Sequence, residues 1–363
     1  MLKEQLLLGS LIILASTLTV LMGGCGGVTD TLTPDTPTPN HTPTPGASGA
    51  FAQNARLGRG VNLGNALEAP QEGGWGVILE EEYFQWIEDG GFDSVRVPIR
   101  WSAHAAETAP YTIDPSFFER VDWVIEQSLS RGLVAVINVH HYEGIVENPA
   151  EHEQRLLALW EQIAERYQEY PDDLLFEVLN EPNGRLGSSE WNQLLAKAID
   201  VIRQTNPDRN IVIGPTHWNG INYLSTLELP DDDRIIVTVH YYDPFQFTHQ
   251  GAEWASGSDA WLGRTWRGTA VEEQNVARDI GLAAAWGEAN NRPIYLGEFG
   301  AYNKADMESR ARWTAYVARQ AEEKGMSWAY WEFCAGFGVF DKVLGRWNEE
   351  IREALIPSKD QSP

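Results

Sequence analysis

The chain has 363 residues, and its 27 Lys and Arg against 52 Asp and Glu give a formal net charge of −25. Hydrophobic residues make up 43% of the chain and charged residues 22%, which excludes a wholly disordered protein. The acidity argues against nucleic acid and anionic membrane surfaces as partners, and two cysteines are too few for a disulfide scaffold. The 15 Trp are the outlier, because filling a core does not by itself explain so many.

Residues 1–25 have the pattern of a secretory signal peptide. Lys3 gives the start a positive charge, and an apolar run from Leu6 to Met22 precedes small residues and Cys25. The end of this run resembles a bacterial lipoprotein signal, in which Cys25 would carry the lipid. Ordinary cleavage and an uncleaved anchor are the alternatives, since the run is long enough to approach a bilayer span. All three predict export, so we expect an extracellular or cell-surface protein that meets the membrane only through this anchor.

A Thr/Pro-rich segment over residues 26–50 follows the signal. Each Pro removes a backbone donor and the segment has little to bury, so we expect an extended, semi-rigid spacer. No second linker or obvious repeat occurs from residue 51 to 357. We therefore expect one catalytic domain of roughly 300 residues there, with a tail over residues 358–363.

Eight short apolar runs alternate with longer amphipathic stretches through this domain. Such near-continuous runs are typical of strands buried on both faces of a parallel sheet. Eight strands with intervening helices predict an α/β fold, a (β/α)8 TIM barrel, and the lack of a phosphate-binding loop disfavours a nucleotide-binding sheet. The expected strands cover residues 60–63, 94–97, 133–139, 174–179, 211–214, 235–239, 294–296 and 327–331, and the clearest helices cover 114–131, 149–170, 188–205 and 307–324.

Polar and aromatic residues recur where the expected strands end. Active sites of β/α barrels form at the C-terminal ends of the strands, so this recurrence indicates an active site. The residues at these positions are Asn62, Asn65, Arg96, His140, His141, Asn180, Glu181, His217, Trp218, Asn219, His240, Tyr242, Glu298 and Trp331.

Two of these residues, Glu181 and Glu298, are carboxylic acids that end the fourth and seventh strands. Two carboxyls that flank a bond can hydrolyse a glycoside, one as acid and the other as nucleophile or base, if their pKa values differ. Arg96 could hold Glu298 ionised, with a hydrogen bond from Tyr242, whereas the sequence offers no cation for Glu181. Each Glu alone could be an ion-paired strand end, but together they favour a glycosidase.

The same segments resemble glycoside hydrolase family 5, the cellulase-type family of retaining β/α-barrel glycosidases. The resemblance covers about residues 59–347, essentially the whole domain. The matching segments are Gly60-Val61-Asn62-Leu63-Gly64-Asn65, Ser94-Val95-Arg96-Val97-Pro98, Val139-His140-His141, Leu179-Asn180-Glu181-Pro182, His240-x-Tyr242, Gly297-Glu298-Phe299-Gly300 and Trp331.

The resemblance implies a role for each matched side chain. Glu181 would be the general acid/base and Glu298 the nucleophile of a retaining enzyme that forms a covalent glycosyl-enzyme. His240 would orient Glu181, and Tyr242 and Arg96 would support Glu298.

The resemblance also implies how one sugar unit is held. Asn180 would bond its 2-hydroxyl, His140 the adjacent hydroxyl, and Trp331 would form the floor beneath it. Family members often have a cis peptide after this Trp. We expect no cofactor. We also expect no metal, because adjacent His140 and His141 on a strand point to opposite sides and are unsuited to a joint site.

Tryptophans outside the helices are candidates for further sugar contacts, because pyranose rings pack on aromatic faces. Trp75, Trp218 and Trp254 follow expected strands, although packing of a lid is the alternative reading of each. His141, His217, Asn65 and Glu68 are further candidates for sugar contact. Helical positions predict core packing for Trp86, Trp123, Trp160, Trp191 and Trp313.

The loop over residues 241–250 resembles the glucan-cleaving branch of the family and favours an endo-β-1,4-glucanase acting on cellulose-type or mixed-linkage β-1,3-1,4-glucan. A β-mannanase or xyloglucanase of the same family is the alternative. A non-catalytic surface glycan-binding protein is disfavoured because both Glu181 and Glu298 are present. A phosphate-handling aldolase is disfavoured because no strand end carries a candidate Lys. We expect a monomer whose partner is a β-glucan polysaccharide or oligosaccharide.

Overall fold

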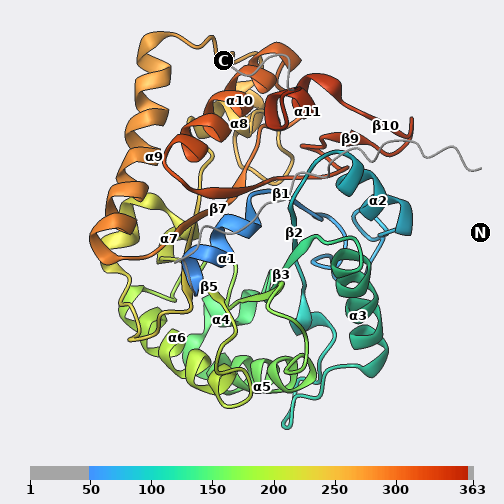
Figure 1. Cartoon of the computed structure of the whole chain (residues 1–363), viewed down its shortest axis with the longest axis vertical. Coiled ribbons are helices and arrows are strands. Elements are labelled where there is room, and N and C mark those ends of the chain that lie inside the picture. The colour runs from blue at the N-terminus through green and yellow to red at the C-terminus, as the bar shows by residue number, and fades with distance from the viewer. Residues whose placement is uncertain (1–48, 359–363) are drawn as a thin grey trace, which may run out of the picture. The chain divides into compact units, whose positions relative to one another are not determined.

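The computed structural model describes residues 49–358, in which eight strands form a closed barrel (Figure 1). Each strand pairs in parallel with the next along the chain, and β8 pairs with β1 to close the barrel. This order confirms the predicted (β/α)8 fold. The strands are β1 Arg59–Asn62, β2 Ser94–Val97, β3 Val134–Asn138, β4 Leu174–Glu177, β5 Ile211–Ile213, β6 Ile235–His240, β7 Ile294–Phe299 and β8 Ser327–Tyr330, and a separate hairpin pairs β9 Phe340–Asp341 with β10 Arg346–Trp347.

Helices connect the strands, and three of them, α3, α9 and α10, begin at a side-chain cap. Asp114 caps α3 by accepting from the Ser116 amide, and Thr269 and Glu272 form a capping box on α9. The helices are α1 Ala50–Leu57, α2 Glu81–Asp89, α3 Pro115–Leu129, α4 Glu143–Glu147, α5 Pro149–Arg166, α6 Ser188–Arg203, α7 Thr216–Asn219, α8 Phe245–Thr248, α9 Ala270–Asn290, α10 Met307–Glu323 and α11 Glu349–Leu355, with 3-10 turns at Trp101–Ala103, Ile221–Thr226 and Ser258–Trp261.

The four clearest predicted helices are present, each ending one to four residues earlier than expected. One long helix, α9, is absent from the prediction, whereas α2 carries Trp86 at an expected helical position. The buried face of α9 consists of Val276, Ile280, Ala283 and Gly287, so two of its four core positions are too small to give a hydrophobic period.

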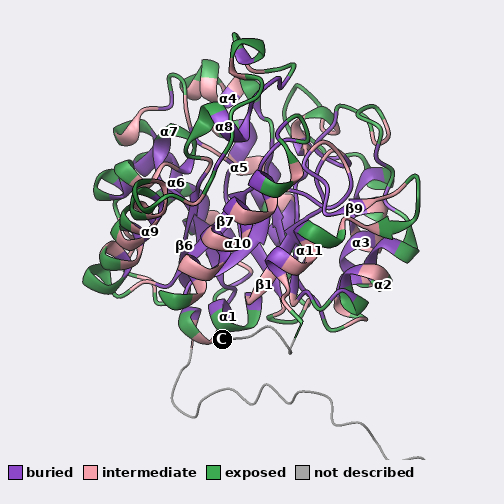
Figure 2. Cartoon of the chain, turned by 90° about the horizontal axis from the view of Figure 1, so that it is seen from above, coloured by how far each residue is buried: buried purple, intermediate pink, exposed green. Residues whose placement is uncertain are grey.

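The end of the barrel where the strands begin is apolar. α1 covers this end, and its Ala50 and Leu57 pack with inward-facing strand residues such as Val136 and Tyr295. Figure 2 shows the buried strands enclosed by helices, with α1 at one end and α4 and α8 at the other. The polar side chains identified from the sequence gather at that other end.

The predicted signal peptide with Cys25 and the Thr/Pro-rich segment up to residue 48 lie outside the described residues, as do residues 359–363 of the tail. The first described helix, α1, begins at Ala50. Within residues 49–358, no helix combines the length and the apolarity needed to cross a membrane.

The fourth strand ends earlier than its apolar pattern suggests. β4 stops at Glu177, and residues 178–181 form the turn that carries the candidate acid. Within this turn the Asn180 amide donates to the Val139 carbonyl at 2.9 Å, and Glu181 has a left-handed backbone with φ of 46°. Such a backbone is uncommon outside Gly and is often found at active sites.

Candidate active site

A buried arginine organises the C-terminal end of the barrel. Arg96 on β2 has no exposed surface, and its Nε and Nη2 bond both carboxylate oxygens of Glu177 at 2.6 and 2.7 Å. Its Nη1 donates to Glu298 Oε1 at 2.6 Å and to Asn62 Oδ1 at 2.9 Å. Its Nη2 also donates to Asn180 Oδ1 at 2.7 Å. Three other strands, β1, β4 and β7, are thus fixed to one guanidinium group on β2.

Glu298 on β7 receives two donors. Arg96 bonds one of its oxygens, and the Tyr242 hydroxyl donates to the other at 3.0 Å. Burial raises the pKa of Glu298 above its ordinary value, and His240 and Arg96 oppose this rise. The contacts expected from the sequence are therefore present, but burial acts against the ionised form that they favour.

Glu181 is the less constrained carboxyl. Its Oε1 lies 2.8 Å from Nδ1 of His240, and its side chain keeps 26% of its surface exposed. Burial raises the pKa of Glu181 to about 7, against the opposing charge of Arg96. A proton therefore stays on this carboxyl at a pH where an ordinary Glu has lost it.

Glu181, His240 and Glu298 offer oxygen and nitrogen atoms that all lie within 4.8 Å of one another. Zinc bonds to such atoms at about 2.0–2.2 Å in a tetrahedron, which would keep two ligand atoms more than 3 Å apart. The contact between Nδ1 of His240 and Oε1 of Glu181 is shorter, at 2.8 Å, and is accounted for by a hydrogen bond. The absence of a metal stays a prediction.

His140 and Trp331 lie together beside the carboxyls. Their rings stack with centroids 5.9 Å apart and planes 16° from parallel, and the Asn138 amide contacts Nδ1 of His140 at 3.0 Å. Burial lowers the pKa of His140 well below its ordinary value, so the ring is neutral. The peptide after Trp331 is cis, as the family resemblance implies. A Cβ on Gly64 would lie 3.1 Å from the Trp331 ring, so this loop approaches the ring closely because it carries Gly.

One candidate for sugar contact is corrected by the structure. Glu68 has no exposed surface, because its carboxylate turns back to accept the backbone amides of Asn65 and Ala66. It stabilises the loop after β1 and does not reach solvent. Asn65, in the same loop, is partly buried and has a left-handed backbone with φ of 64°.

The aromatic candidates for outer sugar contacts are exposed at this end of the barrel. Trp75, Trp218 and Trp254 expose 43%, 56% and 61% of their surfaces. Trp75 meets the exposed His141 edge to face at 5.4 Å, and His217 stacks on Tyr223 with centroids 3.7 Å apart. The predicted core positions differ sharply, since Trp160, Trp191 and Trp313 are at most 1% exposed and Trp86 and Trp123 are partly buried against the core.

Sequence reasoning missed two residues that hold the site. Glu177 is the bidentate partner of Arg96, and Asn138 contacts His140. Asn219 was named as a strand-end residue without a role, and its Nδ2 contacts the far nitrogen of His240 at 3.2 Å. A charged residue inside the apolar run of β4 is the signal that could have identified Glu177. Asn138 carries no such signal, because an amide near a strand end is common.

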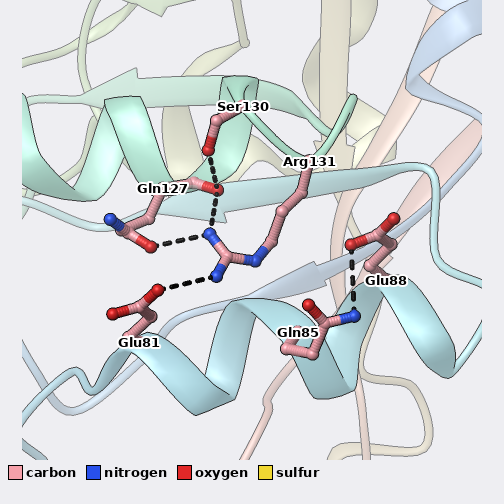
Figure 3. A pocket seen from close by; sticks show the side chains of 6 residues that line it. All are labelled: Glu81, Gln85, Glu88, Gln127, Ser130 and Arg131. Carbon is pink, nitrogen blue, oxygen red and sulfur yellow. Dashed lines mark hydrogen bonds and ion pairs between the residues drawn. The ribbon is translucent and has the colours of Figure 1, made fainter. Parts of the chain in front are cut away.

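A groove on the outer surface lies away from this site, between α2 and α3 (Figure 3). Arg131 spans it, with hydrogen bonds to Gln127 at 2.6 Å and to Glu81 at 3.2 Å. The groove is lined by charged and amide side chains that bond one another, and it holds none of the strand-end residues described above.

The fold and the paired carboxyls define a β/α-barrel glycoside hydrolase. Residues 58–336 match the family described as Cellulase (glycosyl hydrolase family 5), and the chain belongs to this family.

Similar proteins carry endoglucanase names. Endoglucanase H of Acetivibrio thermocellus is 39% identical over 308 residues, which make up 85% of this chain and 33% of that protein, so the chain spans about a third of that relative. Endoglucanase B of Clostridium cellulovorans is 27% identical over 82% of this chain and 73% of that protein. The crystal structure of endoglucanase Cel5A from Thermotoga maritima is 52% identical, covers 85% of this chain and 100% of that one, and has a TM-score of 0.83. Other structures of Cel5A are complexes with cellobiose and with mannotriose.

Proposed function

We propose that the protein is an endo-acting β-1,4-glucanase that hydrolyses cellulose-type and mixed-linkage glucan with retention of configuration. The observation that carries the mechanism is the separation of the two carboxyls, whose oxygens approach within 4.8 Å. Retaining glycosidases hold these groups about 5–5.5 Å apart, whereas inverting enzymes need about 6.5–9.5 Å to admit a water.

In the first step, Glu298 attacks C1 of the sugar and the bond from C1 to the leaving oxygen breaks. Glu181 donates its proton to that oxygen, which leaves as the hydroxyl of the released chain. Glu298 suits attack because Arg96 and Tyr242 orient its two oxygens. Glu181 suits donation because its raised pKa keeps the proton available near neutral pH.

In the second step, Glu181, now ionised, takes a proton from water while the water oxygen attacks C1. The ester to Glu298 breaks, and two inversions leave the original configuration. Asn180 and His140 supply polar groups for the sugar hydroxyls, and Trp331 supplies the apolar face on which the ring rests. The Arg96 contact fixes the Asn180 oxygen, so its amide NH2 is the group free to meet a hydroxyl.

The substrate test uses residues 49–363 and measures reducing-sugar release from carboxymethyl-cellulose, barley mixed-linkage glucan, mannan and xyloglucan. We expect release from the first two substrates and its loss in Glu298→Ala. A variant as active as its parent would contradict the mechanism. Release from mannan alone would contradict the glucanase assignment and leave the mechanism intact.

β-Mannan is the second candidate substrate. The observation that favours it is the complex of Cel5A with mannotriose, in a protein 51% identical to this chain over 84% of its length. The mannan measurement in the assay above decides whether this chain also hydrolyses mannan.

We further propose that the enzyme acts outside the cell as a lipid-anchored monomer. The support is the export pattern of residues 1–25, with Cys25 as the lipid site, and the Thr/Pro-rich spacer that would hold the domain off the membrane. Cys25→Ala should release the protein from the membrane fraction, and gel filtration of the domain should give the monomer mass.

A further inference from the structure

Asn219 lies behind Glu181 and His240, which we call the acid/base pair. Its side chain has no exposed surface, and its Nδ2 lies 3.2 Å from Nε2 of His240. The other nitrogen of that ring, Nδ1, contacts Oε1 of Glu181 at 2.8 Å. Asn219, His240 and Glu181 therefore form a chain of hydrogen bonds that ends at the acid.

The backbone that carries Asn219 is unusual. His217, Trp218 and Asn219 have successive left-handed φ values of 59°, 59° and 54°. Such a run of non-Gly residues is costly and persists only where the surroundings hold it. Here the Trp218 amide donates to the Pro182 carbonyl at 3.2 Å, and Gly220 forms a parallel bridge with His240. The segment is thus attached beside both members of the acid/base pair.

The sheet also leaves space for this side chain. A Cβ at Gly214, on the end of β5, would collide with the Asn219 amide. A glycine at this position therefore admits the amide beneath the site, where it meets His240 and no solvent.

The contacts of the ring decide where its proton lies. Burial lowers the pKa of His240 to about 4, so the ring is neutral and carries one N–H. Nδ1 faces an oxygen of the Glu181 carboxyl at 2.8 Å and an oxygen of Glu298, the Arg96-paired carboxyl, at 3.5 Å, so the proton belongs on Nδ1. Nε2 is then an acceptor in a buried site and needs a donor, which the Nδ2 of Asn219 provides.

We propose that Asn219 is a positioning residue that fixes the tautomer of His240 and thereby selects which oxygen of Glu181 carries the transferable proton. When Nδ1 donates to Oε1, the acid's proton remains on Oε2. From there it passes to the glycosidic oxygen as the bond from C1 breaks and Glu298 bonds C1. The inference rests on the proposed function, because it takes Glu181 to be the acid.

An aspartate at position 219 provides a sharp test, because an ionised carboxylate can accept hydrogen bonds but cannot donate one. It would require a proton on Nε2, either by reversing the tautomer or by making the ring cationic. The first change turns the proton of Glu181 toward the ring, and the second lowers the pKa of Glu181 through a neighbouring positive charge. Both changes remove acid catalysis although Asp has the shape of Asn.

The experiment compares Asn219→Asp and Asn219→Ala with the parent on two substrates. Barley glucan needs protonation of its leaving group, whereas 2,4-dinitrophenyl β-cellobioside does not. On barley glucan we expect kcat/KM to fall about 100-fold for Asn219→Asp and about 10-fold for Asn219→Ala. On the dinitrophenyl substrate we expect kcat/KM within about 3-fold of the parent for both, because bond cleavage there needs no acid. The basic limb of the pH profile should move to lower pH in Asn219→Asp.

Other ionisable groups face Glu181 and His240 from neighbouring elements and stay in place in these variants. A shifted limb therefore reports the contact at residue 219. These groups are Arg96 on β2, Glu177 on β4, His140 after β3, Tyr242 after β6 and Glu298 on β7.

Asn192→Asp is the matched control. This buried amide on α6 holds the end of the following 3-10 turn, through the Thr226 carbonyl at 2.9 Å and the Glu228 backbone amide at 3.2 Å, and no hydrogen bond joins it to His240. We expect it to keep the parent pH profile. Three results would overturn the proposal. The first is the same pH shift in this control, and the second is an equal loss of kcat/KM on both substrates in Asn219→Asp. The third is a higher kcat/KM on glucan for Asn219→Asp than for Asn219→Ala.

Glu181→Ala tests the assignment of the acid separately from the role of Asn219. If it loses activity selectively on barley glucan while Asn219→Asp does not, the inference about Asn219 fails alone. If Glu181→Ala shows no such selectivity, the assignment of the acid itself fails.

Discussion

Glu181 and Glu298 are the same residue type at the same end of one barrel, yet their surroundings differ. Glu298 accepts from a cation and a hydroxyl, Arg96 at 2.6 Å and Tyr242 at 3.0 Å. Glu181 contacts one neutral ring, His240, at 2.8 Å. Burial raises the pKa of both carboxyls, but only Glu298 has a cation bonded to it.

The difference comes from the strands that surround each carboxyl. β2 contributes Arg96 and β6 leads into Tyr242, and both side chains point at β7. The turn after β4 carries Glu181 past the reach of the guanidinium, which instead bonds its neighbour Asn180. A barrel can therefore give two identical residues the roles of nucleophile and acid by the strand ends that carry them.

Removing Glu298 should cause the largest loss of activity, and it is the most severe test of the difference between the two carboxyls. Glu298→Ala should lower kcat on glucan by at least about 10⁴-fold, because no other group can form the bond to C1. Azide, a small nucleophile, should restore cleavage and give an α-glycosyl azide. A β-glycosyl azide from this variant would mean that the roles of Glu181 and Glu298 are the reverse of those assigned.

Removing Glu181 should cost about 10²–10⁴-fold on glucan, the usual contribution of a general acid. With azide and an activated substrate, Glu181→Ala should give a β-glycosyl azide, since the nucleophile is still present. In the parent, kcat/KM should fall as the pH rises through about 7, because the acid is then deprotonated. A basic limb that survives in Glu181→Ala would show that another group titrates there.

Removing the hydroxyl of Tyr242 should have a moderate effect. Tyr242→Phe deletes a donor to the ionised form of Glu298, so kcat should fall about 10-fold and the acidic limb should move to higher pH. Tyr241→Phe is the matched control, because its hydroxyl contacts Asp279 at 3.2 Å, away from the site. Equal effects of the two substitutions would mean that the contact with Glu298 contributes nothing specific.

The smallest effect is expected at an exposed aromatic residue. Trp254→Ala should raise KM for long glucans a few-fold and leave the unfolding free energy within about 0.5 kcal/mol of the parent. Trp160→Ala, at a fully buried position with its indole N–H bonded to Val178, should instead cost about 3–5 kcal/mol of stability. Chemical denaturation and kinetics on both variants separate sugar binding from packing.

The barrel and the strand-end residues could be predicted from sequence, because the parallel order brings every C-terminal strand end to one face. The contacts of Glu298 with Arg96 and Tyr242 can be predicted from this order alone. Glu68 shows the limit of this reasoning, because its loop folds the carboxylate inward onto the amides of Asn65 and Ala66.

Asn219 shows a second limit. The sequence places it in a loop after β5, but its contact with His240 depends on three successive left-handed residues and on the space at Gly214. Backbone conformations of this kind leave no mark in a pattern of apolar and polar residues. The α9 helix was missed for a related reason, because Ala283 and Gly287 on its buried face do not register as hydrophobic.

The most direct test of the account is to trap the covalent intermediate. Incubation with 2,4-dinitrophenyl 2-deoxy-2-fluoro-β-cellobioside slows both steps and should allow the glycosyl-enzyme to accumulate. Mass spectrometry should then show one added fluorocellobiosyl group, located on Glu298 in the peptide digest. An adduct on Glu181, or turnover with inversion and no adduct, would contradict the assignment of the two carboxyls.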